Sequence, residues 1–382
     1  LGLVNSQEAR RMLDRIIGFK LSGLLQSKLK SKSAGRVQSV ALKLIVDLEK
    51  EILAFVPETY FEVEAMFNGL KASHQHGSKR LKKDAADHIL KVAVNPFEVT
   101  QIEAKENKRF SKPPYTTSTL QQDASRHLGY SATKTMMLAQ QLYEGVEMDG
   151  QINGLITYMR TDSTRLSKEF YGPALSYIED TYGKAYKGSY KETTKANAQD
   201  AHEAIRPTTL AYTPEFVKAH VKKTSFKNDS MFNQAMKLYE RIYNRTLASL
   251  MAPAVFEQTK VIVTSNDESF KIDGVRLLFD GFTKLYDDVN TKDQLLPAFT
   301  LGQSLTADEV VSIEKQTQPK ARYNEASLIK TLDTLNIGRP STYATILKTL
   351  SDRHYVTKEK GKFIPTEQGI LTSDELDKFF NE

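Results

Sequence analysis

The order of helix-like and strand-like segments is the feature that most constrains the fold of this 382-residue chain. Stretches with apolar residues at helical spacing alternate with stretches in which every second residue is apolar. The helix-rich stretches are approximately 6–50, 120–251 and 324–352, and the strand-rich stretches are approximately 60–104 and 254–311. This nested order predicts a helical domain inserted into a β domain, which is itself inserted into another helical domain. A chain with this path can return on itself as an arch or ring.

Three domains are expected from this order, two of them discontinuous. Residues 1–52 and 318–382 would form a helix-rich DNA-binding domain, residues 53–117 and 245–317 the β domain, and residues 118–244 the inserted helix-rich domain. The net charge is +6, and the basic residues gather at both ends of the chain. Residues 1–50 contain ten Lys and Arg against four Asp and Glu, and residues 318–362 contain nine against four. The two basic segments predict one surface that binds a polyanion.

Composition excludes several kinds of chemistry. Cysteine is absent, so disulfides, zinc–thiolate sites and thiol nucleophiles are excluded. No apolar run approaches the roughly 18 residues of a membrane span, and no signal peptide is visible. These features predict a cytoplasmic protein without a membrane partner. The chain opens with Leu1-Gly2-Leu3 and has no initiator methionine, so we expect it to be a piece of a longer polypeptide.

A candidate nucleophile lies in the string Gly154-Leu155-Ile156-Thr157-Tyr158-Met159-Arg160-Thr161-Asp162-Ser163-Thr164. Its apolar start predicts a strand end, and in extended backbone Tyr158 and Arg160 point to the same face. A phenol is a weak nucleophile until a cation stabilises its oxyanion or the phosphate that it attacks. The guanidinium of Arg160 can hold two phosphate oxygens at once. The spacing suits phosphate chemistry at Tyr158, although a strand end with a structural tyrosine gives the same bare pattern.

A histidine and an arginine occur together in Ala201-His202-Glu203-Ala204-Ile205-Arg206-Pro207-Thr208. If this segment is helical, His202 and Arg206 lie one turn apart on one face, with Glu203 beside them. Both could then bind a phosphate, and His202 could shuttle a proton. The segment is far from Tyr158 in sequence, so spacing alone does not bring the two together.

Small residues open a predicted helix in Ser33-Ala34-Gly35-Arg36-Val37-Gln38-Ser39. Backbone N–H groups are exposed at such a helix start, and a phosphate fits there. Arg36 and Gln38 can add side-chain donors to the phosphate or to a base edge. The helix start alone is a weak signal for phosphate binding. Contact of residues 33–38 with DNA is what a family resemblance, carried by this string and by later ones, implies. We expect Arg11 and Arg15 on the preceding amphipathic helix to extend the same basic surface.

The final segment has the pattern of a winged helix. Helices are predicted over 324–335 and 341–352, and residues 355–365 predict a hairpin with a basic tip. Arg339, Ser341 and Thr342 cluster at the start of the second of these helices, which favours a phosphate. We expect these three residues and Arg353 to contact DNA.

Several strings resemble, in matching order, those of type IA DNA topoisomerases. They are residues 33–39, 116–121, 136–143, 154–164, 201–208 and 338–343, and the resemblance covers essentially the whole chain. It implies an α+β multidomain fold with an arch or toroid core, in which two helix-rich domains with winged-helix-like elements are joined by an antiparallel β domain. It also implies that Tyr158 forms a bond to the 5′ phosphate of a cut strand, and that Arg160 and His202 support that phosphate. The strings are closer to bacterial topoisomerase I than to topoisomerase III or reverse gyrase.

The resemblance carries further expectations about cofactor and partner. Members of the family relax negatively supercoiled DNA without ATP, by cutting one strand, passing the other through the gap and resealing it. They bind Mg²⁺ through acidic residues of a separate Toprim domain, which precedes the segment seen here, and many carry a zinc-binding tail. Neither an equivalent acidic cluster nor that tail is found in this sequence. We therefore expect a monomer that binds single-stranded DNA at the bacterial nucleoid, holds no metal itself and cannot relax DNA alone.

Two other functions fit parts of the sequence. A non-catalytic winged-helix DNA-binding protein would use Tyr158 only structurally and would bind duplex DNA with sequence preference. A tyrosine recombinase would need an Arg…His-x-x-Arg set, which is not found because Arg206 follows His202 one residue too late. A covalent DNA adduct through Tyr158 separates these functions.

Overall fold

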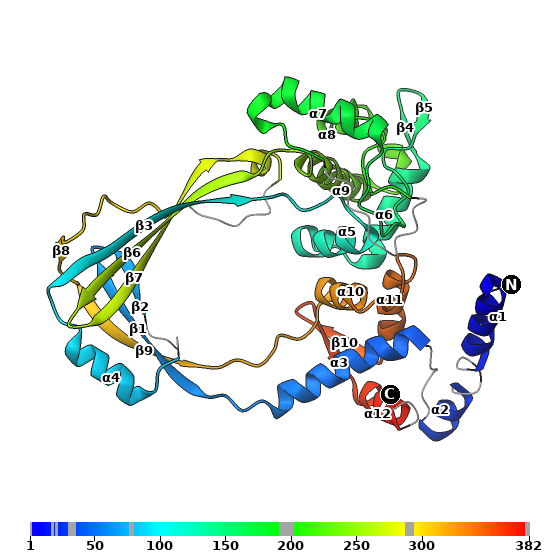
Figure 1. The fold of residues 1–382 in the computed structure, drawn as a ribbon. Helices are drawn as coiled ribbons and strands as arrows, with labels where there is room; N and C mark the ends of the chain where they lie inside the picture. Colours follow the sequence, from blue (N-terminus) through cyan, green and yellow to red (C-terminus); the bar gives the residue numbers. More distant parts are fainter. Residues whose placement is uncertain are drawn as a thin grey trace.

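The computed structural model describes residues 2–16, 19, 22–29, 36–75, 80–190, 202–286 and 294–378. Figure 1 shows a closed ring around a central opening, with helices on one side and a curved β sheet on the other. We call the helices of residues 117–248 the upper lobe and those of residues 36–54 and 325–377 the lower lobe. The chain leaves the lower lobe, crosses the sheet to the upper lobe and returns by the same route (Figure 1). The predicted α+β fold, with an arch joining two helix-rich parts, is confirmed.

The helices of the two lobes are interrupted by short hairpins. The lower lobe contains α3 (Arg36–Ala54), α10 (Glu325–Thr334), α11 (Tyr343–Asp352), β10 (Val356–Glu359), β11 (Lys362–Pro365) and α12 (Glu367–Asp377), and it is preceded by α1 (Gly2–Arg15) and α2 (Ser22–Leu29). The upper lobe contains α5 (Thr117–Asp123), α6 (Ala132–Glu144), β4 (Val146–Met148), β5 (Gln151–Asn153), α7 (Lys168–Tyr182), α8 (Pro214–His220) and α9 (Asp229–Ala248). The hairpin predicted over residues 355–365, which follows α11, is confirmed, because β10 and β11 pair in antiparallel register.

Seven strands form one antiparallel sheet in the order β8-β3-β6-β7-β2-β1-β9. They are β1 (Thr59–Phe67), β2 (Leu70–His74), β3 (Phe97–Arg109), β6 (Ala254–Ser265), β7 (Glu268–Phe279), β8 (Ser304–Leu305) and β9 (Glu309–Gln316). The long strands β3, β6 and β7 extend towards the upper lobe, whereas β1 and β9 lead back to the lower lobe (Figure 1). α4 (Lys83–Val92) packs against β1 and β9. The sheet thus forms an arch that connects the two lobes (Figure 1).

The buried apolar side chains of the described residues form three separate clusters. One fills the upper lobe, one fills the lower lobe, and one lies between α4 and the sheet. Among the described residues, Ala132 at the start of α6 is the only upper-lobe member of the lower-lobe cluster. The two lobes therefore share very little apolar core. The division of the chain at the predicted domain boundaries stays a prediction.

The lobes meet where α5 and α6 pack against α10 and α11. Glu325, in the first turn of α10, is buried, and its Oε2 accepts a hydrogen bond of 2.6 Å from the Ala132 N–H. The other carboxylate oxygen pairs with Lys358 of β10. Because Ala132 begins α6, the dipole of that helix favours a carboxylate at this point. This polar contact helps to close the ring on the side opposite the sheet.

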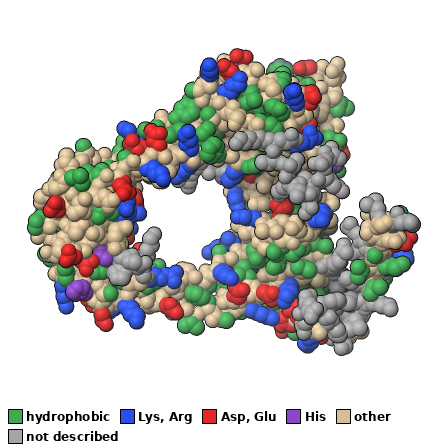
Figure 2. All heavy atoms as spheres, viewed as in Figure 1, with side chains coloured by type: hydrophobic (Ala, Val, Ile, Leu, Met, Phe, Trp, Pro, Cys, Tyr) green, Lys and Arg blue, Asp and Glu red, His purple; other side chains and the backbone are tan. Residues whose placement is uncertain are grey.

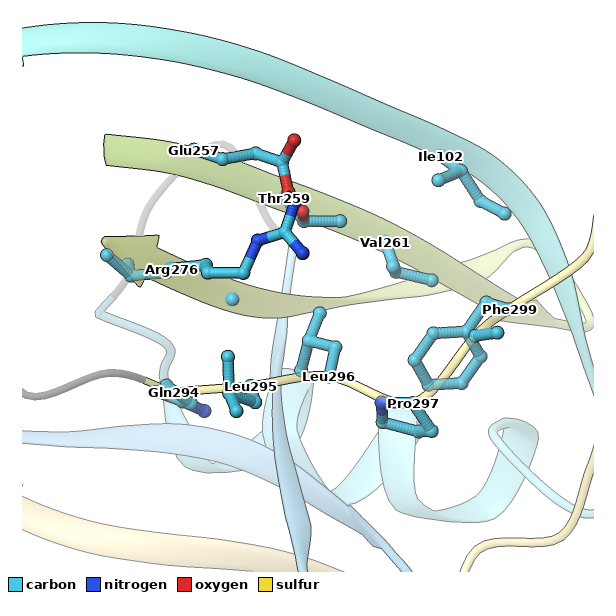
Figure 3. Close-up of a pocket in the computed structure, with 13 residues that line it drawn as sticks. Ile102, Glu257, Thr259, Val261, Arg276, Gln294, Leu295, Leu296, Pro297 and Phe299 are labelled. Atoms are coloured by element: carbon cyan, nitrogen blue, oxygen red, sulfur yellow. Dashed lines mark ion pairs between the residues drawn. The ribbon is translucent and has the colours of Figure 1, made fainter. Parts of the chain in front are cut away.

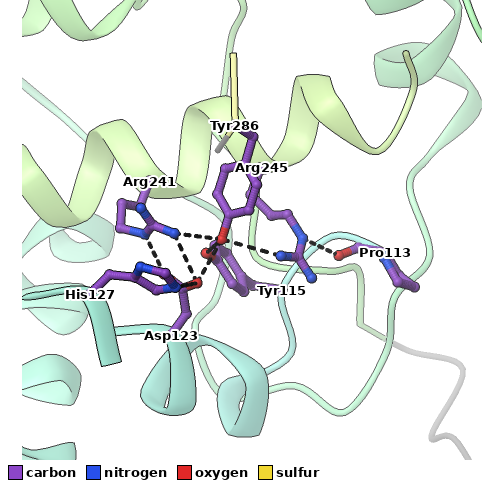
Figure 4. Close-up of polar contacts among 7 residues, drawn as sticks. All are labelled: Pro113, Tyr115, Asp123, His127, Arg241, Arg245 and Tyr286. Atoms are coloured by element: carbon purple, nitrogen blue, oxygen red, sulfur yellow. Dashed lines mark hydrogen bonds and ion pairs between the residues drawn. The ribbon is translucent and has the colours of Figure 1, made fainter. Parts of the chain in front are cut away.

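A buried polar cluster joins the upper lobe to the segments that lead to the arch (Figure 4). Asp123, at the end of α5, accepts hydrogen bonds from Arg241 of α9 at 3.0 Å and from the Tyr286 hydroxyl at 2.6 Å. Burial alone would raise the pKa of Asp123, but the hydrogen bonds from Arg241 and Tyr286 and the charge of Arg241 outweigh it. The pKa of Asp123 consequently lies below its ordinary value, and the ionised carboxylate stabilises the folded lobe.

Two further contacts of this cluster reach the segments on either side of the arch. The Tyr115 hydroxyl lies 2.7 Å from the Tyr286 hydroxyl, and Arg245 of α9 donates to the Pro113 carbonyl at 2.8 Å. Tyr115 follows β3, and Tyr286 follows β7. The segment that follows β3 and the segment that follows β7 are therefore both held to α5 and α9 through this cluster.

Some elements are missing from the sequence-based expectation. No individual element is assigned from the sequence to α2, before residue 33, or to β2 and α4, which lie between β1 and β3. In α4 only Ala86 and Ile89 are buried, so its apolar stripe is too short to be recognised in the sequence. Packing against the sheet, rather than helix propensity, stabilises such a short helix.

We expect Asp123→Asn to destabilise the upper lobe by about 3 kcal/mol at neutral pH, because it leaves the buried Arg241 charge unpaired. A group with a lowered pKa contributes stability above its unfolded pKa of about 3.9 and loses it as the pH falls through the folded pKa. The difference between the two proteins should therefore shrink below about pH 4. Thermal unfolding at pH 7 and at pH 3 measures it.

The matched control is Asp273→Asn, which removes an exposed pair with Lys271 on the arch. Exposed ion pairs contribute less than about 1 kcal/mol, so this variant should behave as the unaltered protein at both pH values. Equal destabilisation by Asp123→Asn at pH 7 and pH 3 would contradict the assignment of the stability to the ionised carboxylate.

Candidate active site

The backbone around Tyr158 is irregular. Ile156 forms an isolated bridge with Pro207, and residues 157–167 belong to no helix or strand. The predicted strand end is therefore wrong beyond Ile156. The reason is that the backbone groups of Met159 and Thr161 bind the Thr117 hydroxyl instead of a neighbouring strand.

Burial in this segment leaves the two predicted catalytic side chains on the surface. Met159 is 1% exposed and packs in the upper-lobe core. Tyr158, immediately before it, is 36% exposed, and Arg160, immediately after it, is exposed. Among the described residues Arg160 has no hydrogen-bond or ion-pair partner, so its guanidinium is available to an incoming phosphate.

Two aromatic rings lie against Tyr158. The His202 ring centroid is 5.5 Å from the Tyr158 centroid, and the Tyr143 centroid is 5.3 Å away in an edge-to-face arrangement. His202 is itself exposed. The structure thus brings together a phenol and an imidazole that are separated by 44 positions in the sequence.

Thr157 provides the link that places His202 near Tyr158. Its N–H donates to the Arg206 carbonyl at 2.9 Å, and its hydroxyl donates to the Ala204 carbonyl at 2.7 Å. The Arg206 N–H donates back to the Thr157 hydroxyl at 3.0 Å. These bonds hold the 202–208 segment extended beside residues 155–157. The helix considered for 201–208 is therefore wrong, because the backbone of this segment pairs with its neighbours.

Arg206 lies within this segment and is engaged by protein groups. Its Nε donates to Glu203 at 2.6 Å, and its guanidinium lies 4.3 Å from the ring centre of Phe170. Burial would raise the pKa of Glu203, but the hydrogen bond and charge of Arg206 outweigh it and lower that pKa. Arg206 thus anchors the segment that carries His202, and its predicted DNA contact stays a prediction.

The start of α11 carries three of the DNA contacts predicted for the lower lobe. The Thr342 hydroxyl accepts a hydrogen bond from the Arg339 N–H at 2.8 Å, and Arg339 and Ser341 are exposed. Gly338 has φ +82°, and a Cβ there would lie 3.1 Å from the Thr342 hydroxyl. Glycine is therefore required for this tight turn.

The tyrosine segment is linked to the lower lobe through α5. Thr117, the first residue of α5, donates a hydrogen bond to the Met159 carbonyl at 2.6 Å, and α5 packs against α10 of the lower lobe. The tyrosine segment therefore lies close to the junction of the two lobes.

The remaining predicted DNA contacts are spread over the lower lobe and the helices before it. Arg11 and Arg15 are exposed on α1, and Arg353, which follows α11, is half-buried. Val37 and Gln38 are half-buried in the first turn of α3. Arg36 begins α3, and Ser33, Ala34 and Gly35 lie outside the described residues. Lys and Arg side chains are also distributed around the rim of the central opening (Figure 2).

A large cavity on the arch is unrelated to this site. It has a volume of about 410 Å³ and lies where residues 294–299 cross strands β6 and β7 (Figure 3). Its walls are mostly apolar, apart from an ion pair of 3.1 Å between Glu257 and Arg276. None of the predicted catalytic or DNA-binding residues lines it.

The described residues contain no metal-binding group and no membrane-spanning helix. Across the described residues, no three His, Asp or Glu side chains are grouped so that they could hold a metal ion. The residues present therefore do not fit a Mg²⁺ site, and no chemical step is assigned to a metal here. Within the described ranges, no helix has the length and apolar character needed to cross a membrane.

Known proteins share both the sequence and the architecture. A family model described as DNA topoisomerase matches residues 2–382. The chain is 44% identical over 392 residues to DNA topoisomerase 1 of Campylobacter jejuni. The aligned region covers 99% of this chain and 54% of the Campylobacter protein. The structure of full-length topoisomerase I from Thermotoga maritima matches with a TM-score of 0.85 and 39% identity, covering 99% of this chain and 61% of that one.

The chain therefore belongs to the DNA topoisomerase family. Both relatives are bacterial topoisomerases I, so the predicted resemblance to the type IA group, and to topoisomerase I within it, is confirmed. The chain spans about half the length of the curated relative that it matches.

Sequence reasoning missed the threonines that hold the site and one buried amide. Thr117 and Thr157 belong to strings that were singled out, but a hydroxyl that binds distant backbone leaves no periodic signal. Gln121, one helical turn after Thr117, is fully buried, and neither side-chain amide atom has a hydrogen-bond partner among the described residues. An orphaned buried amide costs about 1–3 kcal/mol.

We expect Gln121→Met to stabilise the upper lobe by about 1 kcal/mol or more, because it removes this orphaned amide at similar volume. The midpoint of thermal unfolding should rise. Gln122→Met is the matched control, since the Gln122 amide donates to the Ser118 hydroxyl at 2.9 Å and its loss should not stabilise. A lower midpoint for Gln121→Met would mean that the amide has a partner in solution.

Proposed function

We propose that this chain is the strand-cutting core of a type IA DNA topoisomerase, an isomerase that changes DNA topology. The Tyr158 Oη attacks a backbone phosphorus, the bond from phosphorus to the 3′ oxygen breaks, and a 5′-phosphotyrosyl link forms. The phenol loses its proton, and the departing 3′ oxygen gains one. The reverse attack by the 3′ hydroxyl reseals the strand. One phosphodiester replaces another, so the cycle is nearly isoenergetic and needs no ATP.

The position of Tyr158 is the observation that carries this proposal. Its phenol is exposed and lies against the His202 ring, and its segment is held by α5, which packs against the lower lobe of the ring. A strand bound there can be cut while both of its new ends stay held, one covalently and one by the other lobe. The second strand can then pass into the central opening. Relaxation is driven by the strain of negative supercoils.

Arg160 and His202 would act on the phosphate. The exposed guanidinium can hold two non-bridging oxygens as negative charge develops. The imidazole can bind the phosphate or accept the phenolic proton. We propose that the exposed residues Arg11, Arg15, Arg339 and Ser341, together with residues 33–38, Arg206, Thr342 and Arg353, bind the single strand around this point. We expect the protein to act as a monomer on nucleoid DNA in the cytoplasm.

Complete activity requires a further module in this proposal. We expect Mg²⁺ to bind to the acidic residues of a separate Toprim domain, because the described residues offer no such site. The 382-residue chain should bind a single-stranded oligonucleotide. Incubated with Mg²⁺ and negatively supercoiled plasmid, the same chain should give no relaxation. Efficient turnover by this chain alone would contradict the assigned role of the module.

The decisive test is a covalent adduct. The chain preceded by its Toprim module should form a denaturant-resistant complex with a single-stranded oligonucleotide labelled downstream of the cut, and Tyr158→Phe should abolish it. Tyr143→Phe is the matched control, because its ring contacts Tyr158 and is also exposed. Adduct formation by Tyr158→Phe would place the nucleophile elsewhere. Sequence-selective duplex binding without any adduct would instead favour a winged-helix DNA-binding protein.

A further inference from the structure

The hydroxyl of Thr117 binds the backbone on both sides of Arg160. Thr117 is the first residue of α5 and is fully buried. Its Oγ1 donates to the Met159 carbonyl at 2.6 Å and accepts a hydrogen bond from the Thr161 N–H at 2.9 Å. The Thr117 N–H donates to the Thr161 carbonyl at 2.9 Å. One residue of α5 therefore holds three backbone groups of the tyrosine segment.

The hydrogen bonds of Thr117 fix the backbone between Tyr158 and Thr161. Met159 separates Tyr158 from Arg160, so its carbonyl fixes the peptide that joins the two exposed side chains. Thr161 is 2% exposed, and a buried N–H without a partner is unfavourable. Because the segment has no helix or strand of its own, these contacts take the place of regular secondary structure there.

The Thr117 hydroxyl is not needed to cap its own helix. Thr116 is the N-cap of α5, and its side chain and that of Thr119 form the capping box. The Thr116 N–H donates to the Thr119 hydroxyl at 2.8 Å, and the Thr119 N–H donates to the Thr116 hydroxyl at 3.3 Å. The hydroxyls of α5 thus divide between stabilising the helix and holding the tyrosine segment.

α5 is itself a rigid support. Its far end is fixed by the hydrogen bonds and ion pair of Asp123 with Arg241, and its side packs against α10 of the lower lobe. The hydrogen bond from α5 to the Met159 carbonyl therefore links the position of Tyr158 to the Asp123 cluster beside the arch and to the lower lobe.

We propose that Thr117 is a positioning residue that aligns Tyr158 and Arg160 for attack on the phosphate; this rests on the proposed role of Tyr158 as nucleophile. A displacement of about 1 Å in a reacting group can lower a rate about a hundredfold. Binding of the DNA strand by the remaining surface does not depend on this alignment. Loss of the hydroxyl should therefore slow the chemical step and leave DNA affinity unchanged.

The test compares Thr117→Val, Thr117→Ser and Thr119→Val in the chain preceded by its Toprim module. Single-turnover adduct formation on a labelled oligonucleotide gives the rate at saturating protein, and titration without Mg²⁺ gives the Kd. We expect Thr117→Val to slow adduct formation about ten- to a hundredfold with the same Kd. Thr117→Ser keeps the hydroxyl and should restore the rate. Thr119→Val disturbs the capping box and should react within about twofold of the unaltered protein.

Two results would overturn the proposal. One is a normal rate for Thr117→Val, and the other is an equal slowing by Thr119→Val, which would make helix stability the cause. Amide hydrogen exchange of the 382-residue chain supplies a readout that needs no catalysis. The Thr161 N–H should exchange faster in Thr117→Val alone, and unchanged protection would also overturn the proposal. If the unaltered protein forms no adduct while this exchange result holds, the role of Tyr158 as nucleophile fails, and Thr117 still holds the segment.

Discussion

Long antiparallel pairing of β3 with β6, and of β6 with β7, with one register shift in each pair, is the constraint on which the ring depends. The chain reaches the upper lobe along one strand and leaves it along the neighbouring one, so the two crossings are locked to each other by backbone hydrogen bonds. The upper lobe is therefore joined to the sheet by both of its chain connections. The Asp123 cluster then continues the connection into α5 and α9, because it binds residues that follow β3 and β7.

The site itself is built without regular structure. Tyr158, Arg160 and His202 all lie on irregular or extended backbone, and their positions are determined by threonine hydroxyls that bind distant carbonyls and N–H groups. Such short side chains hold a backbone closely because they lose little rotamer freedom. The apolar side chains of Ile156 and Met159 are buried in the core, whereas Tyr158, between them, and Arg160, after them, face outward. Burial of Ile156 and Met159 in the core thus leaves the phenol of Tyr158 on the surface.

The sequence predicted the parts of this structure that have a periodic or local signal. The nested order of elements and the hairpin predicted over residues 355–365 follow from apolar spacing and turn residues. The strings around Tyr158 and His202 were identified by resemblance, which periodicity cannot supply. The missed features depend on tertiary contacts. α4 is a helix because the sheet covers Ala86 and Ile89, and residues 202–208 are extended because Thr157 pairs with them. Neither contact can be read from residues close in the chain.

The character of the lobe-to-lobe contact bears on how the ring behaves as a whole. Among the described residues the lower-lobe cluster receives a single alanine methyl from the upper lobe, and a carboxylate on a helix start closes the contact beside it. Parting such surfaces exposes little hydrocarbon to water, and water can solvate Glu325 and the Ala132 N–H that are released. A junction of this kind can be parted without exposing the apolar core of either half. The covalent arch meanwhile keeps the two halves within reach, so rejoining needs no search through solution.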